Sequence, residues 1–147
     1  MLDKSIVGRQ YAPFSVEVEK GRLRAFAKAI GETNPLYLDE NAARAAGYRS
    51  LLAPPSFGWA IIMEADQGFS VLTDCGIDKA RTVHGEQGFV YHNEICAGDV
   101  VNGRQTVVDY VEKKGGLLQI ITTEIPLVHQ DGRPLCDLRS VIVVRNG

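Results

Sequence analysis

The feature that most constrains this chain is a change of pattern near its middle. The second half holds four segments rich in Val, Ile and Thr, which favour strands: residues 83–91, 99–113, 117–129 and 134–145. They are separated by turn signals, of which the last two suit hairpins directly: Ala97-Gly98, Gly115-Gly116 and Asp131-Gly132-Arg133. Helical spacing occupies most of the first half. The order predicts an α+β domain, with helices first and an antiparallel meander after them.

The first half predicts one strand and two helices before its most apolar segment. Residues 14–18 alternate apolar and polar side chains, as a strand does. Apolar residues then recur at helical spacing over residues 20–30, and Gly31 is a natural stop after them. A second, alanine-rich helix is expected to begin after Asp39 as its N-cap and to end at Gly47.

A central helix is expected after the proline-broken turn that ends at Pro55. Ser56 can cap a helix that runs through Met63 and is apolar nearly all round. Such a helix belongs in the interior. We therefore expect one long buried helix wrapped by a curved antiparallel sheet.

Length and charge narrow the class of protein. A chain of 147 residues fits a single domain over 1–147, and its net charge of −2 provides no broad basic field for nucleic acid. No apolar run reaches the roughly 20 residues that a membrane span needs, and the N-terminus lacks the apolar core of a signal peptide. Cys75, Cys96 and Cys136 show no metal-ligand spacing with the histidines. We expect a cytoplasmic protein with reduced thiols and no metal.

Residues 25–37 carry the most specific motif. They resemble the signature of the MaoC-like hydratases, where a helix ends in G-D-x-N-P-hydrophobic-H, with Glu32 at the aspartate and Tyr37 at the histidine. Three further blocks match that family: residues 45–48 with 52–57, residues 84–87, and residues 97–99. The chain thus resembles the N-terminal MaoC-like dehydratase domain from about Ile6 to Val144. The resemblance implies a hotdog fold.

The resemblance also implies a function. Members of the family interconvert (3R)-hydroxyacyl and trans-2-enoyl thioesters of coenzyme A or acyl carrier protein by removing or adding water. No separate cofactor is implied, since coenzyme A or the carrier's pantetheine is part of the substrate. The implied assembly is a homodimer, or a heterodimer with a second MaoC-like hotdog subunit.

The implied catalytic residues are Glu32 and Tyr37, which keep the family's spacing and change its chemistry. A glutamate can act as a base, but its extra methylene moves the carboxylate by about an ångström or more. A tyrosine, with a reference pKa of about 10, donates a hydrogen bond and accepts a proton poorly near neutral pH. Glu32 could equally be a solvated helix end, Tyr37 a packing residue, and Asn34 a turn-former or a brace of the substrate loop.

Four further residues are candidates for substrate binding. Pro55 aligns with the glycine whose backbone N–H binds the thioester oxygen in the family, and proline has no N–H. Ser56 or Phe57 could donate instead. Strand alternation predicts His84 on one face with Glu86, Gly88, Val90 and His92, and Gln87, Phe89 and Tyr91 on the other. His84 is then an alternative base or a structural histidine.

Three functions remain open. The first is a binding subunit that supplies an acyl tunnel to a catalytic MaoC-like partner, and the second is a self-sufficient homodimeric (R)-specific enoyl-CoA hydratase using Glu32. The third is an acyl-CoA thioesterase. Arg44, Arg49, Lys79 and Arg81 are candidate contacts for phosphates or an acidic carrier.

Overall fold

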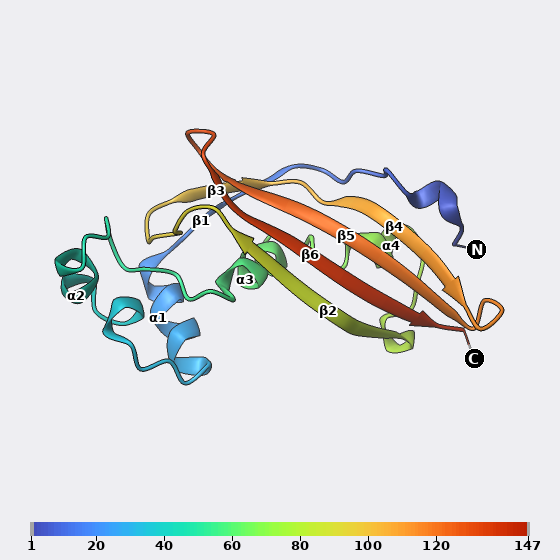
Figure 1. Cartoon of the computed structure of the whole chain (residues 1–147), viewed down its shortest axis with the longest axis horizontal. Coiled ribbons are helices and arrows are strands. Elements are labelled where there is room, and N and C mark those ends of the chain that lie inside the picture. Colours follow the sequence, from blue (N-terminus) through green and yellow to red (C-terminus); the bar gives the residue numbers. More distant parts are fainter. Residues whose placement is uncertain (1, 147) are drawn as a thin grey trace.

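The computed structural model describes residues 2–146, so that Met1 and Gly147, the ends of the predicted domain, lie outside the described residues. An antiparallel sheet forms one layer, and short helices lie against its inner face and at one end (Figure 1). The strands are β1 (Phe14–Glu17), β2 (Thr82–Tyr91), β3 (Val100–Gly103), β4 (Thr106–Lys113), β5 (Leu118–His129) and β6 (Pro134–Arg145). The α-helices are α1 (Lys20–Ala29), α2 (Glu40–Ala45), α3 (Phe57–Glu64) and α4 (Ser70–Asp74), with 3-10 turns η1 (Lys4–Ile6), η2 (Pro35–Tyr37) and η3 (Lys79–Arg81). The α+β class is confirmed.

The sheet has the order β1-β3-β5-β6-β2, and β4 also pairs with β5. The β4, β5 and β6 strands form the expected meander, whereas β2 pairs with β6 on the far side. The single strand predicted over residues 99–113 is wrong, because the chain leaves the ladder at Arg104 and Gln105. Gln105 is 2% exposed and donates to Thr123 Oγ1 at 3.4 Å. This break lets β3 take β1 as its second neighbour while β4 follows the far half of β5.

The inner face of the sheet is covered by two helices in succession. The expected central helix is the eight-residue α3, which begins and ends close to its predicted limits. It stops because Asp66 takes a left-handed conformation with φ 55°, which lets the N–H of Gln67 donate to Ile62 O at 2.9 Å. The short α4 follows and was not predicted. None of the helices within residues 2–146 has the length and apolar character that crossing a bilayer requires.

Each of these helices packs on its own part of the core. Phe57, Ile61 and Ile62 of α3 are buried against β3, β5 and β6, and a Cβ at Gly58 would make ordinary contact with Leu138, at 3.4 Å. Val71 and Leu72 of α4 belong to a second cluster near the chain termini. Figure 1 shows α3 toward the end of the molecule where α1 and α2 also lie.

A bulge in β2 overturns the predicted placement of His84. The register against β6 shifts between His84 and Glu86, so that Gly85 is the extra residue. His84 pairs with Ile142 on the inner face, so its side chain lies on the same face as that of Phe89. The prediction that it shares a face with Glu86 and Val90 is wrong. One inserted residue reverses the face of every side chain before it. The predicted placement of Gln87, Phe89 and Tyr91 on one face is confirmed, and their buried partners on β6 show that it is the inner face.

Candidate active site

The carboxylate of Glu32 sits just past the end of α1. Gly31, with φ 73°, closes that helix, and the N–H of Glu32 donates to Ala27 O at 2.9 Å. The side chain then folds back, and its Oε1 accepts the N–H groups of Thr33 at 2.8 Å and Asn34 at 2.9 Å. One carboxylate oxygen is therefore committed to holding the turn that follows α1.

The next turn places Tyr37. Asn34 caps η2 by accepting the N–H of Leu36 at 3.1 Å, which is the turn-forming role among the two that its sequence position allows. Tyr37 follows within η2 and is partly buried. Burial, and after it the charges of Glu32 and Tyr48, raise the pKa of the Tyr37 hydroxyl, which therefore remains protonated at neutral pH.

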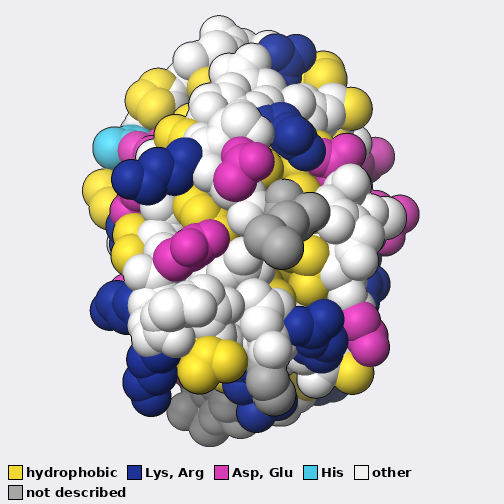
Figure 2. Space-filling view, turned by 90° about the vertical axis from the view of Figure 1, so that its right-hand side faces the viewer, with side chains coloured by type: hydrophobic (Ala, Val, Ile, Leu, Met, Phe, Trp, Pro, Cys, Tyr) yellow, Lys and Arg dark blue, Asp and Glu magenta, His cyan; other side chains and the backbone are white. Residues whose placement is uncertain are grey.

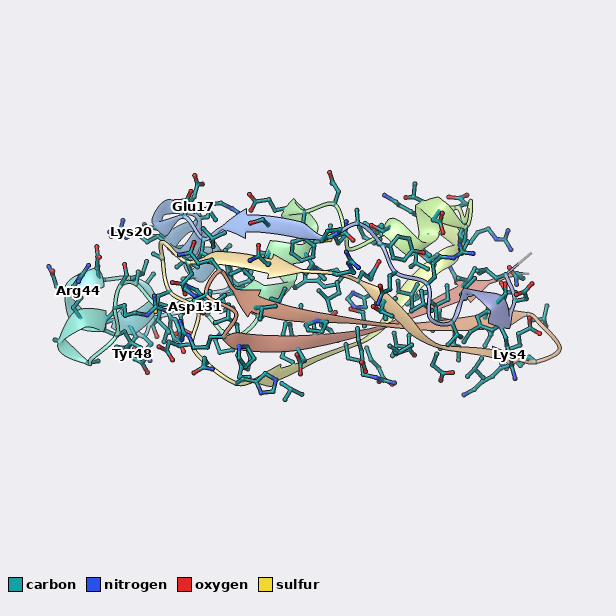
Figure 3. All side chains as sticks on the ribbon, turned by 90° about the horizontal axis from the view of Figure 1, so that it is seen from above. Lys4, Glu17, Lys20, Arg44, Tyr48 and Asp131 are labelled. Atoms are coloured by element: carbon teal, nitrogen blue, oxygen red, sulfur yellow. The ribbon has the colours of Figure 1, made fainter. Side chains whose placement is uncertain are left out.

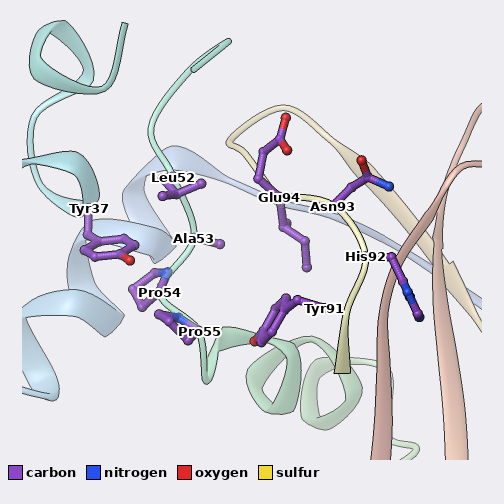
Figure 4. A pocket seen from close by; sticks show the side chains of 10 residues that line it. Tyr37, Leu52, Ala53, Pro54, Pro55, Tyr91, His92, Asn93 and Glu94 are labelled. Atoms are coloured by element: carbon purple, nitrogen blue, oxygen red, sulfur yellow. The ribbon is translucent and has the colours of Figure 1, made fainter. Parts of the chain in front are cut away.

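A pocket of about 380 Å³, the Tyr37 pocket, opens between this turn, the loop before α3 and the end of β2 (Figure 4). Its lining is Tyr37, Leu52, Ala53, Pro54, Pro55, Tyr91, His92, Asn93, Glu94 and Ile95. The two walls are joined by backbone hydrogen bonds from Ala53 N–H to Ile95 O at 2.8 Å and from Ala97 N–H to Leu51 O at 2.9 Å. Of the predicted site residues, Tyr37 and Pro55 meet here.

The start of α3 offers few backbone donors to this pocket. Pro55 has no N–H, and the N–H of Phe57 donates to Pro54 O at 2.9 Å. Phe57 is itself buried, with its ring edge-on to Phe26 at 5.3 Å between centroids. Ser56 is exposed and lies outside the pocket lining, and its side chain makes no capping hydrogen bond, contrary to the prediction.

The two histidines of the β2 region lie apart from the pocket's interior. The ring of His84 packs on Trp59 of α3, with 4.7 Å between centroids. His92 borders the pocket, but Figure 4 shows its ring directed away from Tyr37, and its Nε2 lies 2.8 Å from Asp137 Oδ2. Neither ring faces the pocket centre.

An ion-pair network fixes the loop that carries the pocket's prolines. Asp99, 2% exposed, accepts both Arg49 Nη1 at 2.6 Å and Arg49 Nη2 at 3.0 Å, and also the N–H of Cys96 at 2.9 Å. His129 Nε2 lies 3.6 Å from the same carboxylate, and its Nδ1 lies 2.8 Å from Asp131. Burial raises the pKa of Asp99, but the bonds from Arg49 and Cys96 outweigh it and lower the pKa below 3.8. Figure 3 shows Asp131 at the same end of the molecule as Tyr48, which precedes Arg49.

The other candidate phosphate contacts are also engaged elsewhere. Arg44 donates to Glu40 at 2.9 Å, Lys79 lies over the Phe69 ring, and Arg81 donates to Arg145 O at 3.0 Å. Figure 2 shows both signs of charge interspersed over the end of the molecule that carries the termini. The part of the chain that the structure describes holds no group of three His, Cys, Asp or Glu side chains placed to bind a metal.

The chain matches a known protein family over most of its length. The model of the FAS1-like dehydratase domain region matches residues 5–138. The chain belongs to this family. A UPF0336 protein of Saccharopolyspora erythraea is 37% identical over 145 residues, covering 98% of this chain and 92% of that protein.

Solved structures of dehydratases share the fold of this chain. The HadBC (3R-hydroxyacyl-ACP dehydratase) complex of Mycobacterium tuberculosis superposes with a TM-score of 0.82 at 24% identity, over 97% of this chain and 99% of that chain. The MaoC-like dehydratase of Rhodospirillum rubrum gives 0.70 at 24% identity, over 96% and 94%. The hotdog fold and the resemblance to MaoC-like proteins are confirmed.

The Tyr37 pocket includes residues that the sequence did not single out as site residues. Tyr91, Asn93 and Glu94 line it from the end of β2. For Tyr91 a signal existed, since strand alternation placed it on the same face as Phe89. For Asn93 and Glu94, which follow the strand, the sequence holds no periodic signal.

Proposed function

We propose that this chain is the acyl-thioester-binding subunit of a hotdog hydro-lyase. It binds trans-2-enoyl and (3R)-hydroxyacyl thioesters of coenzyme A or acyl carrier protein, and their reversible hydration requires a second MaoC-like chain. No separate cofactor enters, because the pantetheine arm is part of the substrate. The membership of the chain in the FAS1-like dehydratase region family supports the reaction class.

The observation that carries this proposal is the state of the acid/base pair. Water addition needs one group that takes a proton and one that gives it. Glu32 has one oxygen bonded to the N–H groups of Thr33 and Asn34, and Tyr37 is a protonated phenol. Among the other ionisable side chains that line the pocket, Tyr91 is also a protonated phenol, and His92 and Glu94 are both directed away from Pro54 in Figure 4. This arrangement favours binding over proton transfer.

The free edge of β2 supports a partner. Within residues 2–146, β2 pairs only with β6, so that a ten-residue strand presents its second row of N–H and C=O groups to solvent. Val83, Val90 and Tyr91 on this strand are 47%, 59% and 44% exposed. A second hotdog subunit that pairs along this edge would cover them, and the HadBC structure is itself a complex.

The test is loss of enoyl absorbance with crotonyl-CoA and longer enoyl-CoA substrates, measured with the chain alone and with a MaoC-like chain that keeps the aspartate and histidine. We expect hydration only when both chains are present. Glu32→Ala in this chain should leave the kcat of the mixture unchanged. Hydration by the chain alone that Glu32→Ala abolishes would instead establish a self-sufficient homodimeric hydratase. Release of free coenzyme A thiol would establish a thioesterase.

A further inference from the structure

The Tyr37 pocket lacks a backbone donor at Pro55, where a thioester oxygen would need one. A thioester carbonyl buried without a hydrogen bond loses the hydration that it had in water. The lining of the pocket on the α3 side consists of Leu52, Ala53, Pro54 and Pro55, and the nearby Phe57 N–H already donates to Pro54 O. Side-chain hydroxyls that face this wall can supply the donors that Pro55 and Phe57 do not.

Two tyrosines face this proline floor from opposite walls. Tyr37 projects from η2 and Tyr91 from the end of β2, and Figure 4 shows both hydroxyls turned toward Pro54 and Pro55. The Tyr91 ring stacks on the ring of Phe89 on the same strand, with 6.2 Å between centroids and 13° between planes.

Both hydroxyls are donors at neutral pH. Burial, and after it the neighbouring Cys136 thiol and Tyr37, raise the pKa of Tyr91 well above its ordinary value. The pKa of Tyr37 is raised as well. A thiol sulfur is a weak acceptor, so a carbonyl oxygen that enters the pocket is the better partner for the Tyr91 hydroxyl.

We propose that the hydroxyls of Tyr37 and Tyr91 together bind the carbonyl oxygen of the acyl thioester, in place of the backbone N–H that Pro55 lacks. This inference rests on the proposed function, since it assigns the thioester-binding donors of the same pocket. Two side-chain donors on facing walls also fix the carbonyl between the η2 turn and β2.

The experiment uses the full chain and butyryl-CoA labelled with carbon-13 at its carbonyl, a saturated thioester that cannot be hydrated. Calorimetry measures the Kd, and isotope-edited infrared spectroscopy measures the carbonyl stretch of the bound ligand. The variants are Tyr91→Phe, Tyr37→Phe and the double change, each of which removes a hydroxyl and keeps the ring. The matched control is Tyr11→Phe, whose hydroxyl donates to Asp74 at 3.3 Å beside the second core cluster.

We expect the carbonyl stretch to fall on binding to the wild-type chain, because a hydrogen bond weakens the C=O bond. Each single variant should move it part of the way back and weaken binding about two- to tenfold, which is the range for one neutral hydrogen bond. Tyr11→Phe should change neither reading. If butyryl-CoA binds and Tyr91→Phe leaves its carbonyl stretch unchanged, the assignment of Tyr91 alone is overturned. Absence of butyryl-CoA binding to the wild-type chain, with or without a partner, would overturn the proposed function as well.

Discussion

Replacing Arg49 by methionine tests the ion-pair network that holds the pocket loop. Methionine keeps an unbranched stem and removes the guanidinium that makes two hydrogen bonds to Asp99. The Asp99 carboxylate would stay buried with the Cys96 N–H and His129 as its remaining partners. Breaking a buried pair costs about 3–5 kcal/mol, and because the Arg49 side chain is 47% exposed we expect about 2–3 kcal/mol.

This loss corresponds to a fall in Tm of roughly 4–12 °C for a chain of this size, measured by circular dichroism at pH 7. The matched control is Arg44→Met, which removes one of several partners of Glu40 from a side chain that is 59% exposed and should lower the Tm much less. If the two variants have the same Tm, the buried pair does not stabilise the fold and the reasoning fails.

The same variant has a defined pH dependence. The pKa of Asp99 is lower in the folded chain than its ordinary value of 3.8, so the pair contributes its stability above pH 3.8 and loses it as the pH falls through the folded pKa. The difference in unfolding free energy between wild type and Arg49→Met should therefore be full at pH 7 and shrink below about pH 4. Urea denaturation at several pH values measures it, and a difference that stays constant down to pH 3 would contradict this assignment.

Three further changes test the packing and the helix start. Ile61→Ala removes a fully buried side chain of α3 and should lower the unfolding free energy by about 2–5 kcal/mol in urea; a loss under about 1 kcal/mol would show that the helix does not form the core. Gly103→Ala places a Cβ 2.5 Å from the Phe14 ring and should lower the unfolding free energy by about 1–3 kcal/mol. Phe14→Leu should restore part of this loss, whereas an unchanged unfolding free energy would mean that the ring moves freely. Asp39→Ala removes the acceptor of the Asn41 N–H and should lower the unfolding free energy by about 1 kcal/mol, with faster amide exchange in α2. An equal loss with Asp39→Asn would refute the capping role.

The candidate site shows what a motif can and cannot predict. The sequence predicted that Glu32, Asn34 and Tyr37 form one turn after a helix, because Gly31 and the Asn-Pro pair act on their immediate neighbours. It did not predict that Glu32 Oε1 would bind two backbone N–H groups, since a glutamate at this position has several partners within reach. Nor did it predict that Tyr91 would face Tyr37, because that contact depends on how β2 packs against a distant loop.

The sequence by itself determined the kinds of element and their order, except for α4 and the division between β3 and β4. Branched residues produced the strands, glycines ended α1 and α2, and Gly115-Gly116 formed a hairpin, because each of these preferences acts within a few residues. Only the tertiary structure decided the bulge at Gly85, the break at Gln105 and the place of β2 beside β6. The register and pairing of a strand depend on its partner strand and on which side chains the pairing buries. The partner strand lies far along the chain, so local preferences do not determine them.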